Sequence, residues 1–68
     1  MSTTLEAKIL AALKPGGMLT IATIALNVQI AEWEAKRAAL ELQRRDFAFE
    51  NLRNEWQITP AGRRAATR

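Results

Sequence analysis

The chain has 68 residues, a formal net charge of +3 and a hydrophobic content of 49%. A chain of this length forms one small domain with a marginal core, and its apolar content argues against disorder. The sequence has no cysteine, which excludes disulfides and thiolate metal sites, and no histidine, which removes the commonest general base and metal ligand. We therefore expect no enzyme activity, no metal site and no cofactor.

The sequence also argues against a membrane or secreted protein. No apolar run approaches the roughly 18 residues of a membrane span, and the first residues, MSTTLE, lack the charged start and apolar stretch of a secretion signal. We expect a protein of a bacterial or phage cytoplasm. Charge is uneven, with net −1 over residues 1–35 and net +4 over residues 36–68. This asymmetry indicates an anionic partner for the C-terminal half, although a solvated surface would give the same pattern.

The first predicted helix covers about residues 4–14. Thr3 to Glu6 has the spacing of a capping box, and Leu5, Ile9 and Leu13 share one face. The segment KPGG at 14–17 ends this helix, because proline disfavours helix at the preceding residue and glycine permits a turn. The apolar pair at 18–19 is either a short strand or a plug in the core.

Two further helices are predicted at about 20–28 and 31–45, with a tight bend between them. Thr20 can cap the first of these, because its hydroxyl can accept a free backbone N–H of the first turn. The apolar positions then recur at helical spacing: Ile21, Ile24, Ala25 and Val28 in the first helix, and Ala35, Ala39 and Leu42 in the second.

After Asp46 the pattern changes from a helical period to alternation. We predict a β-hairpin over about 47–59 with a four-residue tip at 51–54, followed by a short helix over about 60–67. Thr59 can cap that helix and Pro60 suits its first turn. Two strands alone are barely stable, so the hairpin must lie on the helices.

These elements resemble the winged helix-turn-helix family of DNA-binding domains. The residues that carry the resemblance are Ile24-Ala25, Val28, Ile30, Ala35, Arg37, Ala39, Leu42 and Phe47-Ala48, followed by WQITPAGR at 56–63, which is similar to the Y-R-L-T-P-A-G-R that closes the wing in many bacterial transcriptional regulators. Gln29 and Asp46 stand where the family has glycine, and Ala31 stands where it has serine. Gln29 must therefore adopt the backbone geometry itself or shift the turn to Asn27.

The resemblance implies an α+β fold. Residues 1–68 would form a single winged helix-turn-helix domain, with a three-helix core followed by a β-hairpin wing and a short C-terminal helix. It also implies double-stranded DNA as the partner, a role as a small bacterial or phage transcriptional regulator, and no small-molecule ligand. The third helix would enter the major groove and the hairpin tip would reach the backbone or minor groove.

On this reading the DNA contacts fall into two groups. Lys36 and Arg37 would read bases, helped by Gln29, Glu32 and Trp33 near the helix start. The phosphates would meet Arg44, Arg53 and Arg63, together with the backbone at the start of the helix capped by Thr20. For Arg63, which belongs to the segment similar to the family's wing ending, a structural role is equally open.

A rival hypothesis rests on a second stripe of the third helix, formed by Trp33, Arg37, Leu40 and Arg44. Trp33 and Leu40 either extend the core or pack under the wing, or they mark a contact with another protein, since Trp and Arg dominate interface hot spots. Glu32 and Glu34 would also repel phosphate. The alternative function is a winged-helix protein-interaction module that does not bind DNA, such as a phage-encoded inhibitor or a component of a larger complex. A homodimer would form through Trp33 and Leu40 or through the first helix.

Overall fold

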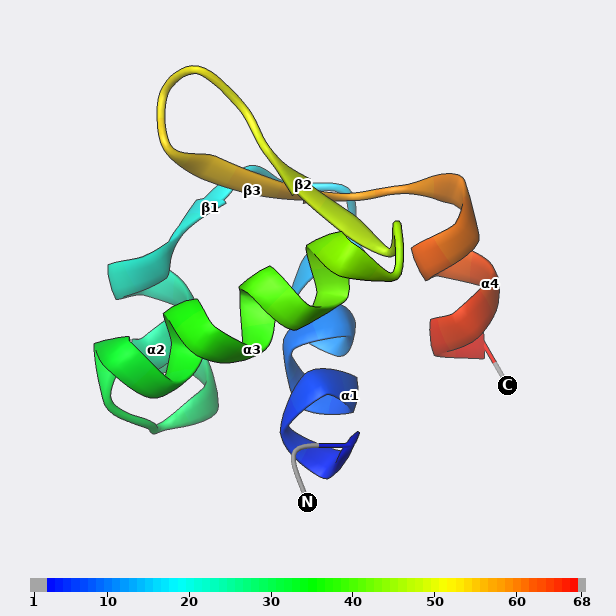
Figure 1. The fold of residues 1–68 in the computed structure, drawn as a ribbon. Coiled ribbons are helices and arrows are strands. Elements are labelled where there is room, and N and C mark those ends of the chain that lie inside the picture. The colour runs from blue at the N-terminus through cyan, green and yellow to red at the C-terminus, as the bar shows by residue number, and fades with distance from the viewer. Residues whose placement is uncertain (1–2, 68) are drawn as a thin grey trace.

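The computed structural model describes residues 3–67, and side chains from residue 5 to residue 66. Its elements are α1 (Thr3–Leu13), β1 (Leu19–Thr20), α2 (Ile21–Val28), α3 (Glu32–Arg44), β2 (Ala48–Glu50), β3 (Glu55–Ile58) and α4 (Pro60–Thr67) (Figure 1). The three strands form one antiparallel sheet in the order β1-β3-β2. The capping box expected at the start of α1 depends on the side chains of Thr3 and Thr4, which lie outside the described side chains.

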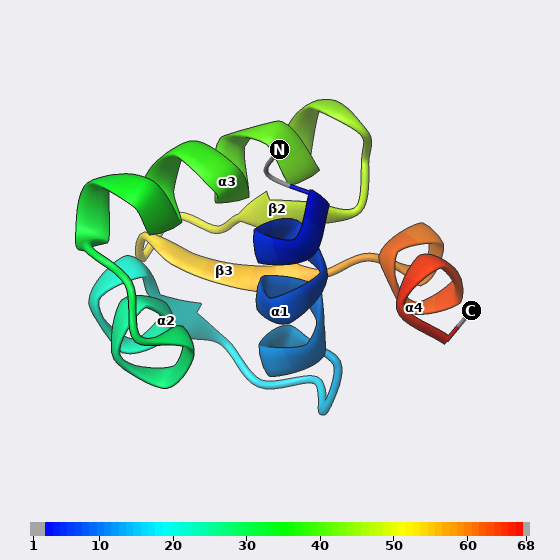
Figure 2. The same ribbon diagram turned by 90° about the horizontal axis from the view of Figure 1, so that it is seen from below.

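Helices α1, α2 and α3 pack together, and the sheet lies across them (Figures 1 and 2). The largest fully buried side chains come from all parts of this body: Trp56, Ile9, Leu13, Ile24 and Leu42. Ala35, Ala38 and Ala39 are also buried, so α3 turns a face of small residues and one leucine to the core. The expected α+β fold, a three-helix core with a hairpin wing and a short last helix, is confirmed.

Helix α2 begins at the N-cap that the sequence predicts. The Thr20 hydroxyl accepts the N–H of Thr23 at 3.2 Å, which is the N-cap hydrogen bond predicted for this residue. Of the preceding apolar pair, Leu19 belongs to the short strand β1, where it pairs with Trp56, and it also packs against the core. Met18 precedes the strand and is 52% exposed, so it does not plug the core.

The bend between α2 and α3 passes through Gln29 itself. Its φ of 62° and ψ of 52° are left-handed, and Ile30 N–H donates to Ala25 O at 3.0 Å to close the end of α2. Asp46, just beyond α3, has a φ of 64°. The two non-glycine residues that replace the family's glycines therefore both take the backbone conformation that favours glycine.

The hairpin and α4 are joined by one threonine. The Thr59 hydroxyl donates to Asp46 O at 2.6 Å and accepts the N–H of Gly62 at 2.9 Å, so it closes the base of the wing and caps α4. Gly62 lies against the carbonyl of Phe47. The two ends of the hairpin, which follow α3 and precede α4, are thus held together at its base.

A buried ion pair that sequence reasoning missed links α1 to the residue after α3. The Glu6 carboxylate is nearly inaccessible and lies 3.2 Å from a guanidinium nitrogen of Arg45, whose side chain is half exposed. Glu6 therefore serves a tertiary contact, whereas the sequence pattern had assigned it only to the first turn of its own helix. Over residues 3–67, no helix has the length and apolar character to cross a membrane.

Candidate functional site

The outward side of α3 is a stripe of large side chains, which we call the α3 outer face: Trp33, Lys36, Arg37, Leu40 and Arg44. All five are exposed, while the four buried positions of the helix point the other way. The spacing is that of one helical face, three or four residues apart. Because the inner face consists of three alanines and Leu42, α3 lies close to the core. The side chains of the outer face project into solvent.

Lys36 and Arg37 are the free cations of this face. Neither has a hydrogen-bond or ion-pair partner among residues 3–67, and both are exposed. Arg44 differs, since its guanidinium lies 3.3 Å from the Glu41 carboxylate one turn earlier. Lys36 and Arg37 are therefore the groups on α3 best placed to meet an anion from another molecule.

The carboxylates of α3 reduce the positive field at this face. Glu34 Oε1 accepts the backbone N–H of Ala31 at 3.1 Å and caps the helix, and Glu32 is exposed beside it. Helix α3 holds three cations and three carboxylates, and the hairpin 48–58 holds Arg53 against Glu50 and Glu55. An anion would therefore be held here by individual side chains rather than by a broad basic field.

The hairpin tip is an ordered turn. Asn51 Oδ1 accepts the N–H groups of Arg53 at 2.8 Å and Glu55 at 3.0 Å, and Asn51 Nδ2 donates to the Glu55 carboxylate at 3.2 Å. Asn54 takes a left-handed φ of 62° and completes the turn. Arg53 is exposed, and its side chain has no partner in the described part of the chain.

The predicted contact residues divide between two ends of the molecule. In both ribbon views the hairpin tip and the start of α3 lie at one end, and α4 lies at the opposite end (Figures 1 and 2). The turn before α3 and the first half of that helix hold Gln29, Glu32, Trp33, Lys36 and Arg37, so these residues lie at the same end of the molecule as the hairpin tip.

Arg44 and Arg63 lie apart from that group. Arg44 is the last residue of α3, at the end of the helix that leads back to the base of the hairpin. Arg63 belongs to α4, and its Nη1 donates to the carbonyl of Lys14 at 2.7 Å, just past the end of α1. Arg63 therefore has a structural contact, one of the two roles that sequence reasoning left open for it.

Trp33 and Leu40 do not extend the core. Trp33 is 64% exposed and Leu40 is 42% exposed, so the expectation that they are buried is wrong, and the protein-contact interpretation of these two residues remains. The tryptophan of the core is Trp56, which is completely buried in β3. Sequence reasoning also missed Leu52, which is fully exposed at the hairpin tip; its signal was a large apolar residue inside a four-residue turn.

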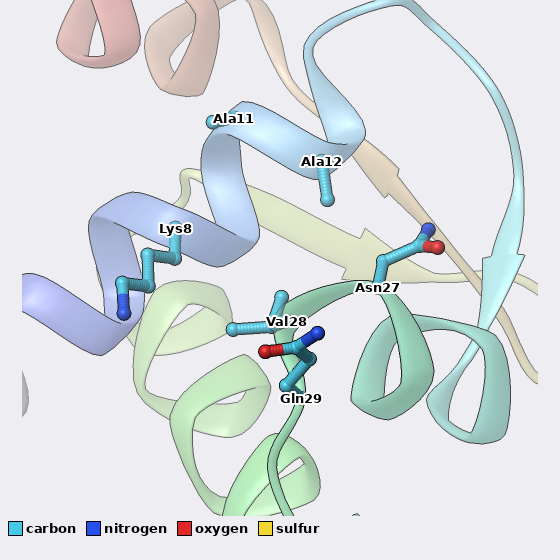
Figure 3. A pocket seen from close by; sticks show the side chains of 6 residues that line it. All are labelled: Lys8, Ala11, Ala12, Asn27, Val28 and Gln29. Carbon is cyan, nitrogen blue, oxygen red and sulfur yellow. The ribbon is translucent and has the colours of Figure 1, made fainter.

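A shallow groove lies away from this face, between α1 and the end of α2 (Figure 3). Its volume is about 540 Å³, and its lining is Lys8, Ala11, Ala12, Asn27, Val28 and Gln29. The lining has one charged side chain, and the rest are small apolar groups and amides. This composition offers no pair of groups for acid–base or nucleophilic chemistry.

Comparison with solved structures places this fold among known proteins. A MarR family transcriptional regulator from Silicibacter pomeroyi superposes with a TM-score of 0.84 at 21% identity, covering 91% of this chain and 46% of that one. ZitR from Lactococcus lactis gives 0.82 at 22% identity, covering 96% and 48%. The Zalpha domain of Carassius auratus PKZ, solved in complex with Z-DNA, gives 0.79 at 25% identity, covering 85% and 97%.

These likenesses establish a winged helix-turn-helix fold. The chain spans about half the length of the first and second of these proteins and nearly all of the third. No protein-family model matches the sequence, and no curated protein matches it significantly.

Proposed function

We propose that the chain binds double-stranded DNA through α3 and the hairpin and acts as a small transcriptional regulator in a bacterial or phage cytoplasm. The observation that carries the proposal is the pair Lys36 and Arg37, which lie side by side in sequence on an exposed helical face without a carboxylate partner in the described residues. The fold supports it, because one protein of similar structure is a transcriptional regulator and another was solved bound to Z-DNA.

Each contact residue then has a stated role. Lys36 and Arg37 meet base edges in the major groove, where an arginine fork pairs with guanine. Gln29, Glu32 and Trp33 flank them at the helix start. Arg53 and Arg44 contact phosphate on either side, with the N-terminus of α2 as a further phosphate site. We assign Arg63 to holding α4 on α1, because its guanidinium already donates to Lys14 O.

A charge-reversal experiment tests this proposal. We expect Lys36→Glu combined with Arg37→Glu to weaken binding to a duplex pool by at least about 100-fold, because two contacts worth roughly 1–3 kcal/mol each are replaced by repulsion. The matched control is Lys8→Glu with Arg64→Glu, which changes net charge equally at exposed residues outside α3 and the hairpin. If both double variants lost the same amount of DNA affinity, binding would depend on net charge alone and not on a site at α3, which would contradict the proposal.

The duplex pool has two arms. One contains right-handed duplexes of random sequence, and the other contains alternating cytosine–guanine duplex held in the Z form. Both arms are measured by filter binding with the same variants. Preference for one arm identifies the DNA form, and absence of binding in both contradicts the proposal.

A second candidate function is a protein-interaction module, and the exposure of Trp33 and Leu40 favours it. In that case two copies, or this chain and another protein, pack through these two side chains. We expect Trp33→Ala with Leu40→Ala to convert an associated species to a monomer in sedimentation velocity. Leu26→Ala, at a leucine of α2 that is 79% exposed, should leave the association unchanged. A wild-type chain that sediments as a monomer and captures no protein from its host would remove this candidate.

A further inference from the structure

We propose that Leu52 is a wedge that enters between neighbouring base pairs from the minor groove, so that the chain bends the DNA it binds. This inference rests on the proposed function and adds a mode of binding to it. It assigns a role to the one large apolar side chain that the hairpin holds entirely in solvent.

The exposure of Leu52 is the first observation. Its relative exposure is 103%, the highest of the exposed large hydrophobic residues, whereas Trp56 in the adjoining strand is fully buried. Moving an exposed leucine side chain from water into an apolar site is favourable by roughly 1.5–3 kcal/mol. That free energy becomes available to a partner with an apolar slot of the right width.

The order of the turn is the second observation. The backbone N–H groups of Arg53 in the tip and of Glu55 at the start of β3 donate to the Asn51 side chain. The backbone adds bonds from Asn51 N to Glu55 O at 2.8 Å and from Asn54 N to Asn51 O at 3.1 Å. The Asn51 amide also donates to the Met18 sulfur at 3.5 Å, which ties the tip to the segment before β1. Leu52 is therefore presented on a fixed turn, and little conformational entropy remains to be lost when it inserts.

The neighbours of Leu52 identify the partner. Arg53 follows it with a free guanidinium, suited to a phosphate beside the groove or to the acceptors on its floor. Glu50 and Glu55 lie lower in the hairpin and are half-buried, and Glu55 is held by the Asn51 amide. The outermost charge of the tip is thus positive.

The size of the tip favours DNA over a protein. A stable protein–protein interface buries roughly 800 Å² on each partner, far more than one leucine and one arginine offer. A base step admits a single apolar side chain, and leucine is among the residues that proteins use to unstack such steps and kink the duplex by about 20–90°. The hairpin also lies at the same end of the molecule as the start of α3, so both can engage one duplex (Figures 1 and 2).

The experiment measures bending and affinity separately. Circularly permuted duplexes carrying a flexible TA step at varied positions report the bend by electrophoretic mobility. We expect the wild-type chain to bend the duplex by at least about 20°. Leu52→Ala should abolish most of the bend and weaken binding about tenfold, since the free energy of burying a leucine is lost. Asn51→Ala should reduce the bend although Leu52 is still present, because the turn loosens.

Two controls separate the wedge from simpler explanations. Arg53→Ala should weaken binding while the bound duplex stays bent, and Leu26→Ala should change neither quantity. All four substituted side chains lie at the surface or in the turn, and circular dichroism verifies that each variant is folded.

The failures are also distinguishable. A wild-type complex without a bend, or a Leu52→Ala complex bent as strongly as wild type, overturns the wedge and leaves the proposed function standing. A wild-type chain that binds no duplex removes both. A host protein that is captured by the wild-type chain and lost with Leu52→Ala, with no change in DNA binding, also overturns the wedge.

Discussion

Two of the three described non-glycine residues with a left-handed backbone lie on either side of α3. Gln29 precedes the helix with a φ of 62° and Asp46 follows it with a φ of 64°. In this region the Cβ of an L-residue crowds the backbone, at a cost of roughly 1–2 kcal/mol. The direction in which α3 enters and leaves the body is therefore set at both ends by residues under strain.

Replacing these residues with glycine should stabilise the chain. We expect Gln29→Gly and Asp46→Gly each to raise the free energy of unfolding by about 0.5–1 kcal/mol, because relief of the left-handed strain exceeds the entropy that glycine adds to the unfolded chain. Urea denaturation measures the change. Gln57→Gly, within β3, is the control and should lower stability, since its backbone needs no left-handed conformation. A loss of stability in all three variants would contradict the strain argument.

Residue-scale features were predictable wherever a short pattern determined them. The N-cap at Thr20 was predictable because a threonine hydroxyl precedes the first turn of a helix. A left-handed backbone at Gln29 or at Asn27 was predictable because Gln29 stands where the similar family has glycine. Periodicity indicated the stripe of α3 that faces the core, but it did not predict the exposure of Trp33, because a second apolar stripe beside the first could also have extended the core. Only the packed structure shows that the alanines at 35, 38 and 39 face the core without Trp33, which therefore stays exposed.

At the scale of elements, α4 depends on one close approach. A Cβ added at Gly62 would overlap the carbonyl of Phe47 and come within 2.9 Å of Ile58 Cγ1. The Phe47 carbonyl also accepts the N–H of Thr59 at 3.0 Å, so it cannot move without opening the base of the hairpin. Gly62 therefore fixes how closely α4 packs against the wing.

Gly62→Ala should be strongly destabilising. We expect a fall of about 3 kcal/mol or more in the free energy of unfolding, at the upper end of overpacking costs, because the obstructing atoms are backbone. Gly17→Ala is the matched control: nothing lies within 4 Å of its added Cβ, so stability should change little. Thermal unfolding followed by circular dichroism compares the two, and equal midpoints would refute the close-packing account.

Sequence patterns could not predict the contacts between elements that lie far apart in the chain. The hairpin, its four-residue tip and the helix opened by Pro60 follow from local alternation and turn chemistry. The pairing of Glu6 with Arg45 joins residues far apart in sequence, and the contact between Arg63 and Lys14 O does the same. Each depends on how α1 lies against α3 and α4, which no local window contains.

For the whole molecule, the distribution of charge sets the salt dependence of DNA binding. As an upper bound, each free cation of α3 and the hairpin can be counted as neutralising one phosphate, whether it meets that phosphate or a base edge beside it. Lys36, Arg37 and Arg53 would then give a slope of log affinity against log salt of about −2.7. Arg44, paired with Glu41, adds at most one contact. We therefore expect a shallow slope, measured by filter binding at increasing potassium chloride.

A much steeper slope, near about −6, would require the cations of α1 and α4 to join the interface. The Lys8→Glu and Arg64→Glu double variant would then flatten the slope, whereas the α3–hairpin interface leaves it unchanged. This outcome would extend the interface to α1 and α4.

The two tryptophans give the chain a pair of built-in optical reporters. Trp56 is completely buried, with an indole N–H that has no acceptor in the described residues, and Trp33 is 64% exposed. The indole of Trp56 should emit at short wavelength until the core opens, and that of Trp33 at long wavelength with ready access to iodide. A partner that covers α3 would shield Trp33 and leave the emission of Trp56 unchanged, so unlabelled protein can distinguish docking from unfolding.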